Sequence, residues 1–594
     1  MARGRQQRKA GKEKSLLARE SGTCLKKWKG RLPVALLYPN TYSIGVSSLG
    51  FQLVYSLLNA SDDLVCERFF LPEAGEPIRS FESQRPLSDF PLIFYSISFE
   101  HDYLNLARLL LATDIPLFTA DRADELISAE NPLVIGGGVA TFMNPEPLAP
   151  FTDLFLLGEA EGMLADLFAA FAIQLREKTR SQLLFSLQQE QAGAYVPALY
   201  TPLYDKESGQ QYGVAHSPDI PQRISKVIVS TAEKASHSEL LSPAAEFSNL
   251  YVTELGRGCS RGCRFCAAGF IYRPPRLWNA DAVIKGLDER GEEVKRIGLL
   301  GMEMADEEEL ASLSSYLLDS GCSLSFSSLR ADRISGALLN LLGKSNLKTV
   351  AIAPDGASER LRRIINKNLT EEDILLAAER LVTAGLYKLK LYLMIGLPGE
   401  SYEDLQEMID LVKKVKERML PVGKERGRLC EISLSVNSFA PKPWTPFQFH
   451  PFGGIEQREG KTGSAKEAVK SLKEKISFLK KGLRKEANVR INHDKPEKVL
   501  FQAVLARGDR RLAGVLAVMA KEQIPWKQAM KKQGLVPEQY ALVQHAEDTY
   551  FPWNIVDHKI DQKYLWQEYQ KSFEAKTTIA CDTAVCRRCG VCGD

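Results

Sequence analysis

The sequence predicts an α/β protein in three consecutive parts: an N-terminal doubly wound parallel sheet, a partial (β/α)6 barrel, and a mainly helical C-terminal segment that ends in a cysteine-rich knuckle. Three observations predict this. Short apolar runs alternate with amphipathic stretches from residue 31 to 175, as in parallel sheets covered by helices. The alternation resumes, with a longer repeat, from 249 to 455. From 456 to 594 helical patterns dominate, and four cysteines lie close to the end of the chain.

The composition is that of a folded protein with sizeable apolar cores. Of the 594 residues, 44% are hydrophobic and 25% are charged, and the net charge of +3 is too small to indicate a nucleic-acid partner. The sequence has no run of about 18 apolar residues and no apolar segment behind its basic start, so we expect no membrane partner and no secretory signal. Seven of the eleven cysteines fall in two clusters, which favours metal sites in a reducing cytoplasm over disulfides.

Residues 1–30 form a basic segment that we expect to be a mostly disordered tail. Its lysines and arginines suit contact with RNA or ribosomal phosphates, or act only as a solubilising extension. The fold proper is expected to begin at residue 31.

The first domain, 31–175, has apolar strand patterns at 34–40, 91–98 and 132–141, each followed by a helical pattern. Ligands of doubly wound sheets bind at the carboxyl ends of the strands. Gly137 and Gly138 lie at such an end, and so does the phrase GEAEG at 158–162. Residues 176–248 show only short strand patterns and polar stretches, so we expect a connector there.

The second domain, 249–455, is predicted to contain six strand–helix units. The helix that follows Thr370 has acidic residues in its first turn and Gly385 after its end, which are start and stop signals. Barrel chemistry takes place on the loops beyond the carboxyl ends of the strands. The strand patterns begin at Tyr251, Arg296, Leu324, Thr349, Leu389 and Glu431.

The loop after the first of these strands reads GRGCSRGCRFCAAG and carries Cys259, Cys263 and Cys266. Fe–S clusters are ordinarily held by four cysteines. Three thiolates on one short loop would leave the fourth iron of a [4Fe–4S] cube open to a small chelating ligand. Phe265 would shield the cluster and support a flat adenine. A three-cysteine zinc loop is the alternative interpretation of this spacing.

This loop resembles the signature of the radical S-adenosylmethionine (SAM) superfamily. The resemblance implies a [4Fe–4S] cluster on the three cysteines, with SAM bound to the open iron and cleaved reductively. It also implies a reductant such as flavodoxin or ferredoxin.

Later loops match the superfamily's SAM contacts in part. Gly301 and Glu303 stand where a Gly-Gly-Glu motif is common, and Arg330 is placed to pair with the SAM carboxylate or to be a surface cation. Asp355 replaces the family's glutamate. Ser358 either reaches the ribose or caps the following helix.

The phrase MIGLPGES resembles the Gly-x-Pro-Gly-Glu turn of the methylthiotransferase and elongator-type branch, and NSFAPKPWTPFQF at 437–449 resembles the same branch. The resemblance implies that Gly396, Gly399 and Glu400 lie near the adenine of SAM.

The N-terminal domain resembles the cobalamin-binding domain fused to many radical SAM enzymes, through GGGVATFMNPEP and GEAEG. Cobalamin domains with a lower protein ligand use an Asp-x-His-x-x-Gly loop. The stretch after the first strand here, YPNTYSIGVSSLG, has no histidine. Cobalamin held here would lack a protein imidazole, or else the domain only packs or recognises substrate.

The end of the chain carries Cys581, Cys586, Cys589 and Cys592. Four thiolates suit tetrahedral zinc or a closed second Fe–S cluster. ARGDRR at 506–511 and this terminus resemble a group of uncharacterised radical SAM proteins with a fused cobalamin-like domain.

We therefore predict a cytoplasmic radical SAM enzyme that transfers a methyl or methylthio group or performs another radical modification. RNA or a ribosomal component is a candidate substrate. The alternative is a nucleic-acid- or ribosome-associated metal-binding protein without radical catalysis.

Overall fold

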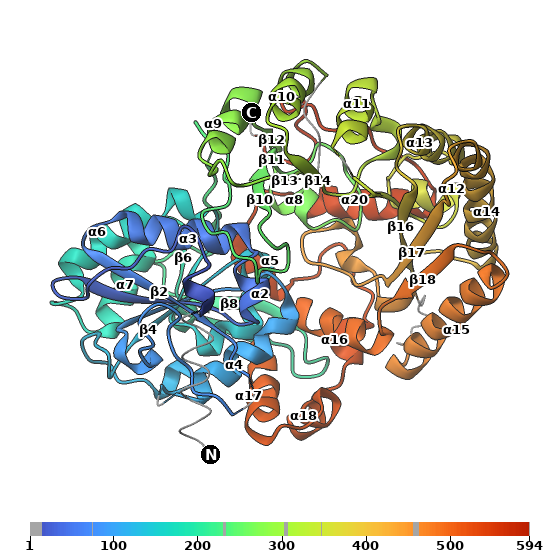
Figure 1. Cartoon of the computed structure of the whole chain (residues 1–594). Coiled ribbons are helices and arrows are strands. Elements are labelled where there is room, and N and C mark those ends of the chain that lie inside the picture. Colours follow the sequence, from blue (N-terminus) through green and yellow to red (C-terminus); the bar gives the residue numbers. More distant parts are fainter. Residues whose placement is uncertain are drawn as a thin grey trace.

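The computed structural model describes residues 15–73, 75–113, 115–229, 233–301, 307–345, 347–454 and 463–592. Figure 1 shows the N-terminal domain beside the barrel, with C-terminal helices lying along the edge of both. The mixed α/β class predicted from the sequence is confirmed.

The N-terminal sheet has the strand order β2-β1-β3-β4-β5-β6. Strands β1 to β5 run parallel, and β6 is antiparallel to β5. This order is that of a doubly wound sheet whose topological switch point lies between β1 and β3. The strands are β1 (Leu32–Tyr38), β2 (Leu64–Phe70), β3 (Leu92–Ser96), β4 (Leu133–Gly137), β5 (Leu154–Leu156) and β6 (Ala194–Tyr195).

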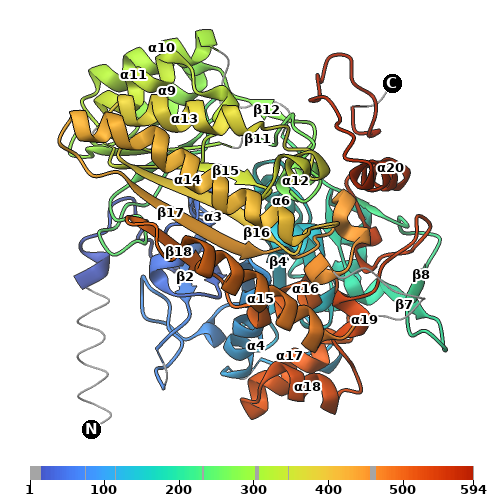
Figure 2. The ribbon, with the colours of Figure 1, turned by 90° about the vertical axis from the view of Figure 1, so that its right-hand side faces the viewer.

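Helices cover both faces of this sheet. One face packs on α3 (Leu49–Ala60), α6 (Leu164–Gln174) and α7 (Arg180–Glu190), through one continuous apolar cluster. The other face packs on α4 (Tyr103–Leu111), which is itself covered by the C-terminal helix α17 (Leu512–Glu522). Figures 1 and 2 show α4 and α17 side by side. The N-terminal domain therefore completes its core with residues from the far end of the chain.

Residues 15–30 differ from the predicted disordered tail, because they lie against the N-terminal domain. Glu20 and Arg68 form an ion pair of 2.6 Å, and neither side chain is exposed. The Lys26 ammonium donates hydrogen bonds to the carbonyl oxygens of Asn59 and Ser61 at the end of α3. Residues 1–14 lie outside the described residues.

The barrel is a curved, wholly parallel set of strands. β10, β13 and β14 form one sheet and β15 to β18 another, and a parallel bridge between Leu329 and Ile352 joins the two. The strands are β10 (Tyr251–Glu254), β13 (Arg296–Leu300), β14 (Ser323–Phe326), β15 (Thr349–Asp355), β16 (Lys388–Ile395), β17 (Glu431–Ser438) and β18 (Val489–His493).

The predicted barrel had six strands, and the described residues contain a seventh, β18. Its sequence, VRINH, is short and polar, and it occupies the edge of the sheet, so it lacks the apolar run that marks the other strands.

Helices cover the convex side of the barrel (Figure 2). The lysine-rich helix α15 (Ala465–Leu483) has one buried and one exposed face. α15 buries Leu472, Ile476 and Leu479, while most of its lysines face outward. The barrel helices are α9 (Ala280–Asp288), α10 (Glu307–Asp319), α11 (Gly336–Lys344), α12 (Glu359–Ile364), α13 (Glu371–Thr383), α14 (Tyr402–Glu425) and α15 (Ala465–Leu483).

Helix α13 begins and ends where the sequence predicts. The Thr370 hydroxyl accepts a hydrogen bond from the Asp373 amide, and the Asp373 carboxylate accepts one from the Thr370 amide, as in a capping box. Gly385 follows the end of the helix with a φ of +95°.

The concave side of the barrel is only partly filled. Along β15, β16 and β17, fully buried residues facing the helices alternate with half-buried residues on the opposite face. The second set includes Ala351, Lys390, Tyr392 and Ser435. Small and polar residues on this face leave room inside the barrel, whereas a filled barrel would carry bulky apolar residues there.

The C-terminal region ties the two domains together. Arg510 of the ARGDRR phrase forms an ion pair with the buried Glu146 at 2.7 Å, and the Asn144 amide donates to the carbonyl oxygens of Ala506 and Gly508. None of the helices in the described ranges is long and apolar enough to cross a membrane. The helices here are α16 (Pro496–Ala506), α17, α18 (Trp526–Lys532), α19 (Glu538–Ala541) and α20 (Gln562–Phe573).

Candidate functional site

The cysteine loop leaves the carboxyl end of β10 and is closed by a short antiparallel ribbon. β11 (Gly256–Arg257) pairs with β12 (Arg276–Leu277) on the far side of the loop. Gly258 has a φ of +88°, and a Cβ atom on it would lie 2.6 Å from the Tyr272 carbonyl oxygen. The Gly-Arg-Gly start of the motif is therefore required by the close approach of the two ends of the loop.

The three thiols lie on one irregular loop, and all three are half-buried. The Cys266 amide donates to the Cys263 carbonyl oxygen at 3.0 Å, so a tight turn joins these two cysteines. Burial, with a contribution from Cys263, raises the pKa of the Cys266 thiol to about 11. In the described part of the chain, no three His, Cys, Asp or Glu side chains meet the geometry of a metal site.

The buried side chain of Arg264 holds the cysteine loop in place. The Arg264 guanidinium, with an exposed fraction of 0%, donates to the Ile364 carbonyl oxygen at 2.8 Å. It also forms an ion pair with Glu568 of α20 at 3.1 Å and donates to the Lys576 carbonyl oxygen. The first contact comes from the barrel and the other two come from the C-terminal region, so the loop is held between them.

Charged groups from neighbouring strands surround the thiols. Burial alone would lower the pKa of Arg330, but Asp332 and then the nearby Cys263 and Cys259 raise it. Lys367 pairs with Asp355 at 2.7 Å and faces Cys263. Burial raises the pKa of Asp355 against the influence of Lys367. The predicted residues Arg330 and Asp355 are thus gathered at the cysteine loop.

Other predicted SAM contacts are engaged inside the protein. The Ser358 hydroxyl accepts from the Leu361 amide as the N-cap of α12 and donates to Asp404, so its structural role is the one observed. Glu400 is buried, pairs with Lys475 at 2.6 Å and accepts from the Gly396 amide.

The glycines of the predicted SAM site are placed as follows. Gly396 and Gly399 have φ values of +77° and +66° in the turn after β16. A Cβ atom on Gly396 would lie 2.8 Å from the Leu472 side chain, so this glycine permits close packing. Gly301 follows β13, and its carbonyl oxygen accepts from the Ser327 hydroxyl. Glu303 lies outside the described residues. Phe265 is half-buried against the core.

The GEAEG phrase of the N-terminal domain binds the base of the cysteine loop. Arg257 pairs with Glu159 at 3.1 Å and with Glu161 at 2.5 Å, and Arg276 pairs with Glu159 at 2.6 Å. Burial alone would raise the pKa of Glu159, but the hydrogen bond from Arg276 and the charge of Arg257 hold it below its usual value. These acids therefore join the first domain to the closing ribbon of the loop.

The C-terminal cysteines lie against the first cysteine loop, although more than 300 residues separate the two in sequence. The Cys581 amide donates to the Ser260 carbonyl oxygen at 2.7 Å. The Asn366 side chain donates to the carbonyl oxygens of Gly262 and Thr578 and accepts from the Thr578 amide. The two motifs thus share a boundary, which no local pattern in the sequence could show.

The four terminal thiols are mutually close enough to affect one another. Burial, and then the neighbouring Cys586, raises the pKa of the Cys581 thiol to about 11. Burial alone would raise the pKa of Cys586, but hydrogen bonds from Arg588 outweigh it, and Nε of Arg588 lies 3.2 Å from the Cys586 sulfur. Burial, and then the neighbouring Cys589 and Cys586, raises the pKa of the Cys592 thiol. Four thiols on one short segment are the type of donor set that holds zinc or an Fe–S cluster.

The predicted cobalamin edge of the N-terminal sheet is partly used for packing. Gly138 has a φ of +100°, and a Cβ atom on it would lie 2.5 Å from the Ile97 backbone, whereas the corresponding space at Gly137 is open. His101, in the short 3-10 turn after β3, is exposed and does not belong to the loop after β1. The described residues therefore provide no imidazole where a lower cobalamin ligand is expected.

Two lysines of the barrel domain, one of them beside the cysteine loop, were missed in the sequence. Lys367 follows α12, where a lysine is unremarkable in one sequence, and its relation to Cys263 arises only from the fold. Lys390 lies on the concave face of β16, with its ammonium 4.6 Å from the centre of the Tyr392 ring. The strict alternation along β16 was the signal that could have identified Lys390 as a residue facing into the barrel.

Comparison with known families gives two matches. Residues 50–197 match the model for the N-terminal region of radical SAM proteins, and residues 253–412 match the model for the radical SAM superfamily. The second match includes the cysteine loop.

Two relatives have been found by sequence. An uncharacterised protein of Methanocaldococcus jannaschii is 28% identical over 505 residues, which cover 85% of this chain and 94% of that protein. The ribosomal protein uS12 methylthiotransferase RimO of Petrotoga mobilis is 25% identical over 201 residues, or 29% of this chain and 42% of that protein.

Among solved structures, the cobalamin-dependent S-adenosylmethionine radical enzyme OxsB matches with a TM-score of 0.48 and 14% identity, over 92% of this chain and 80% of that one. Coproporphyrinogen III oxidase of Escherichia coli matches with a TM-score of 0.27 and 14% identity, over 48% and 78% of the two chains. With its two matching domains and its cysteine loop at the carboxyl end of the first barrel strand, this chain belongs to the radical SAM superfamily and is a radical SAM enzyme of unassigned reaction type.

Proposed function

We propose that Cys259, Cys263 and Cys266 hold a [4Fe–4S] cluster that binds SAM, and that the enzyme modifies its substrate by methyl or methylthio transfer or a related radical modification. The observation that carries this proposal is the thiol trio on a closed loop at the carboxyl edge of a partly unfilled barrel. The cluster, when bound and reduced, supplies the electron for reductive cleavage of SAM.

The residues of the chain have separate tasks in this proposal. Arg330 and Lys367 place positive charge beside the thiolates, which stabilises their deprotonated form and suits the carboxylate of SAM. Asp355 forms an ion pair with Lys367 and lies near Cys266. Phe265 lies within the loop as an apolar shield. Glu159 and Glu161 fix the base of the loop through Arg257.

We assign the four terminal cysteines to a second metal centre, either zinc or an auxiliary Fe–S cluster. Support comes from the contact between Cys581 and Ser260, which joins the segment of the terminal cysteines to the first cysteine loop. A reductant such as flavodoxin or ferredoxin would supply the electrons, in the cytoplasm. Cobalamin on the N-terminal domain would have no imidazole from residues 39–48.

A ribosomal component or RNA is a candidate substrate, supported by the partial similarity to the methylthiotransferase. The alternative of a metal-binding protein without catalysis has no counterpart among the matches.

The proposal is tested with the anaerobically reconstituted protein and dithionite as reductant. Cys263→Ala is expected to reduce 5′-deoxyadenosine formation by about a thousandfold or more, because a cluster that loses one of three ligands no longer presents SAM correctly. Iron and zinc are measured in the same samples, together with Cys586→Ser, which should lose metal from the second centre only.

The matched control is Cys430→Ala, a half-buried cysteine outside both clusters, which should keep the parental rate and metal content. Parental SAM cleavage by the Cys263 variant would show that the trio does not hold the reactive cluster. Unchanged metal in the Cys586 variant would remove the second centre from the proposal.

A further inference from the structure

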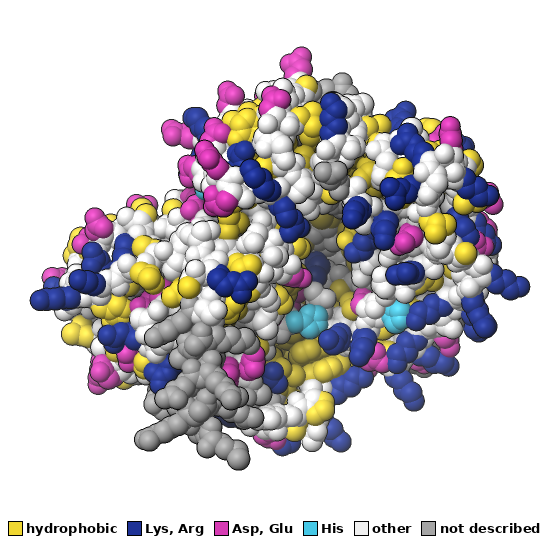
Figure 3. All heavy atoms as spheres, viewed as in Figure 1, with side chains coloured by type: hydrophobic (Ala, Val, Ile, Leu, Met, Phe, Trp, Pro, Cys, Tyr) yellow, Lys and Arg dark blue, Asp and Glu magenta, His cyan; other side chains and the backbone are white. Residues whose placement is uncertain are grey.

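A cavity of about 500 Å³ lies where the functional edges of the two domains meet. Asn437 and Ser438 end β17, His493 ends β18, and His101 follows β3 of the N-terminal sheet. Figure 3 shows the molecule hollowed between the two domains, with histidine and basic side chains along the rim. Its walls come from both domains and from α16, so it is not part of the cysteine loop described above.

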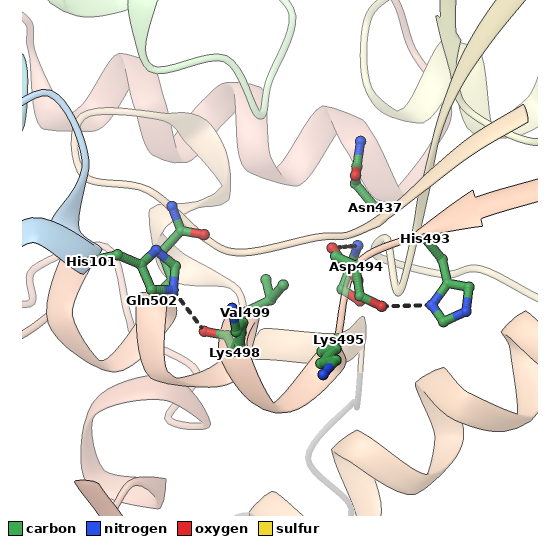
Figure 4. Close-up of a pocket in the computed structure, with 9 residues that line it drawn as sticks. His101, Asn437, His493, Asp494, Lys495, Lys498, Val499 and Gln502 are labelled. Carbon is green, nitrogen blue, oxygen red and sulfur yellow. Dashed lines mark hydrogen bonds between the residues drawn. The ribbon is translucent and has the colours of Figure 1, made fainter. Parts of the chain in front are cut away.

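The side chains in this cavity form two groups. In Figure 4, His101 and Gln502 lie on one side, and Asn437, Asp494 and His493 lie on the other, with Lys495 and Lys498 at the base. A volume of this size is that of a small-molecule site, which is commonly about 300–1,000 Å³.

The acidic groups of the cavity are already satisfied. Asp494 accepts hydrogen bonds from the Ser438 amide and hydroxyl, at 2.7 and 3.0 Å. Glu100, behind the wall, pairs with Lys442 and accepts from the Gln502 amide at 3.0 Å. The carboxylates therefore hold the cavity's walls in place and are not directed as acceptors at a ligand.

The basic groups of the cavity differ from its acidic groups in their contacts. The ammonium groups of Lys495 and Lys498 are exposed in the cavity and have no hydrogen bond or ion pair with the part of the chain that the structure describes. The His493 ring accepts from Lys480, which adds a third ammonium close to the rim. Two ammonium groups face the cavity against the one carboxylate of Asp494.

We propose that this cavity binds the phosphate group of a small phosphorylated substrate, with Lys495 and Lys498 as its ligands. Lysine ammonium groups bind phosphate as point charges, and Asn437 adds an uncharged polar group. A carboxylate would be a weaker match, because it offers less charge to two separate ammonium groups. The inference rests on the proposed function, whose substrate class it specifies.

The position of the cavity supports a substrate site. Barrel enzymes bind their substrates beyond the carboxyl ends of the strands, and doubly wound sheets bind ligands at the same kind of edge. This cavity lies at both edges at once, beyond β17 and β18 and beyond β3. A phosphate held there would orient a substrate between the two domains, on the same barrel edge as the cysteine loop.

The test uses the full-length protein and four probes: inorganic phosphate, glycerol 3-phosphate, succinate and a single-stranded oligonucleotide. Binding is measured by calorimetry and by the rate of lysine acetylation, read for each residue by mass spectrometry. Both phosphate probes should slow the acetylation of Lys495 and Lys498 by about threefold or more, because a bound anion covers their ammonium groups. Lys521, exposed on α17, should react at an unchanged rate.

The double variant Lys495→Gln/Lys498→Gln should bind phosphate at least about tenfold more weakly. The matched control Lys521→Gln/Lys531→Gln removes the same charge from exposed positions on α17 and α18 and should bind as the parent does. Equal binding by both double variants would overturn the inference. Tighter binding of succinate, or binding only of a single-stranded oligonucleotide, would also overturn it.

These measurements do not involve SAM cleavage. A protein that binds phosphate here but never forms 5′-deoxyadenosine would disprove the proposed function and leave the phosphate site standing. A protein that cleaves SAM but whose lysines are not protected by phosphate would disprove the phosphate site and leave the proposed function standing.

Discussion

At the scale of single residues, several side chains that match a superfamily motif serve the fold. Ser358 caps a helix, Glu400 pairs with a buried lysine, and Gly396 permits packing. Arg330 and Asp355, by contrast, do lie beside the thiols. The sequence could predict that these five residues stand at strand ends, but it could not distinguish their roles, because capping and ligand binding use the same residue types.

The adjacent glycines Gly137 and Gly138 give a prediction at this scale. Gly138→Ala should lower the free energy of unfolding by more than about 2 kcal/mol, because its φ of +100° and ψ of 164° suit only glycine and the new Cβ would meet Ile97. Gly137→Ala should cost less than about 1 kcal/mol, since the nearest atom to its new Cβ is 3.9 Å away. Urea titration of both variants checks this, and equal losses would contradict the packing role of Gly138.

At the scale of elements, the sequence could predict features that depend on local patterns but not those that depend on long-range contacts. The strands β1, β3 and β4 of the first domain, the capped helix α13 and the cysteine loop after β10 follow from local patterns in the sequence. β18 was missed because an edge strand needs no apolar run. The contact of Cys581 with Ser260 could not be predicted, since it depends on how α20 packs beneath the loop.

Asn366 provides a test of that contact. Asn366→Ala should increase amide exchange in both 260–266 and 576–581 by about tenfold, because its side chain makes hydrogen bonds to both segments and each contributes about 1 kcal/mol. Asn488→Ala is the matched control, since Asn488 is also left-handed, with a φ of 61°, but is exposed in a distant turn. Faster exchange in only one of the two segments would show that Asn366 does not join them.

At the scale of the whole molecule, buried neutral histidines lie where the parts meet. The His558 ring packs between Phe142 of the first domain and Trp444 at the end of the barrel, at 4.7 and 4.8 Å. His450 lies against Tyr569 of α20. Burial lowers the pKa of His450 to about 3 and that of His558 well below its usual value.

Because these histidines are buried and neutral, we expect acid to destabilise the folded protein in which the domains are packed together. Their folded pKa values lie below that of an unfolded histidine, about 6.5, so the unfolded chain takes up protons first as the pH falls. Stability is therefore full above pH 6.5 and is lost below it. Between pH 7.5 and 5.5 each histidine should cost about 1.4 kcal/mol.

His558→Gln should reduce this loss of stability by about one histidine's share, measured as the difference in unfolding free energy between the two pH values. His216→Gln is the control, because this histidine is half-buried at the end of the hairpin formed by β7 (Tyr200–Tyr204) and β8 (Gln211–His216). A pH difference that is the same in the His558 variant and the parent would show that His558 is not the group that titrates.

Because α17 packs over α4, the core around α4 can be completed only after α17 has been translated. Leu106, Leu109 and Leu110 of α4 share a core with Leu512, Val515 and Leu516 of α17. Some 400 residues separate the two helices, and at about 5–20 residues per second the ribosome needs roughly 20–80 s to make them. During that interval the first domain has left the ribosome with one apolar face uncovered, so its early survival depends on chaperones or on transient self-contacts. The core of the first domain is therefore complete only after the last fifth of the chain has been synthesised.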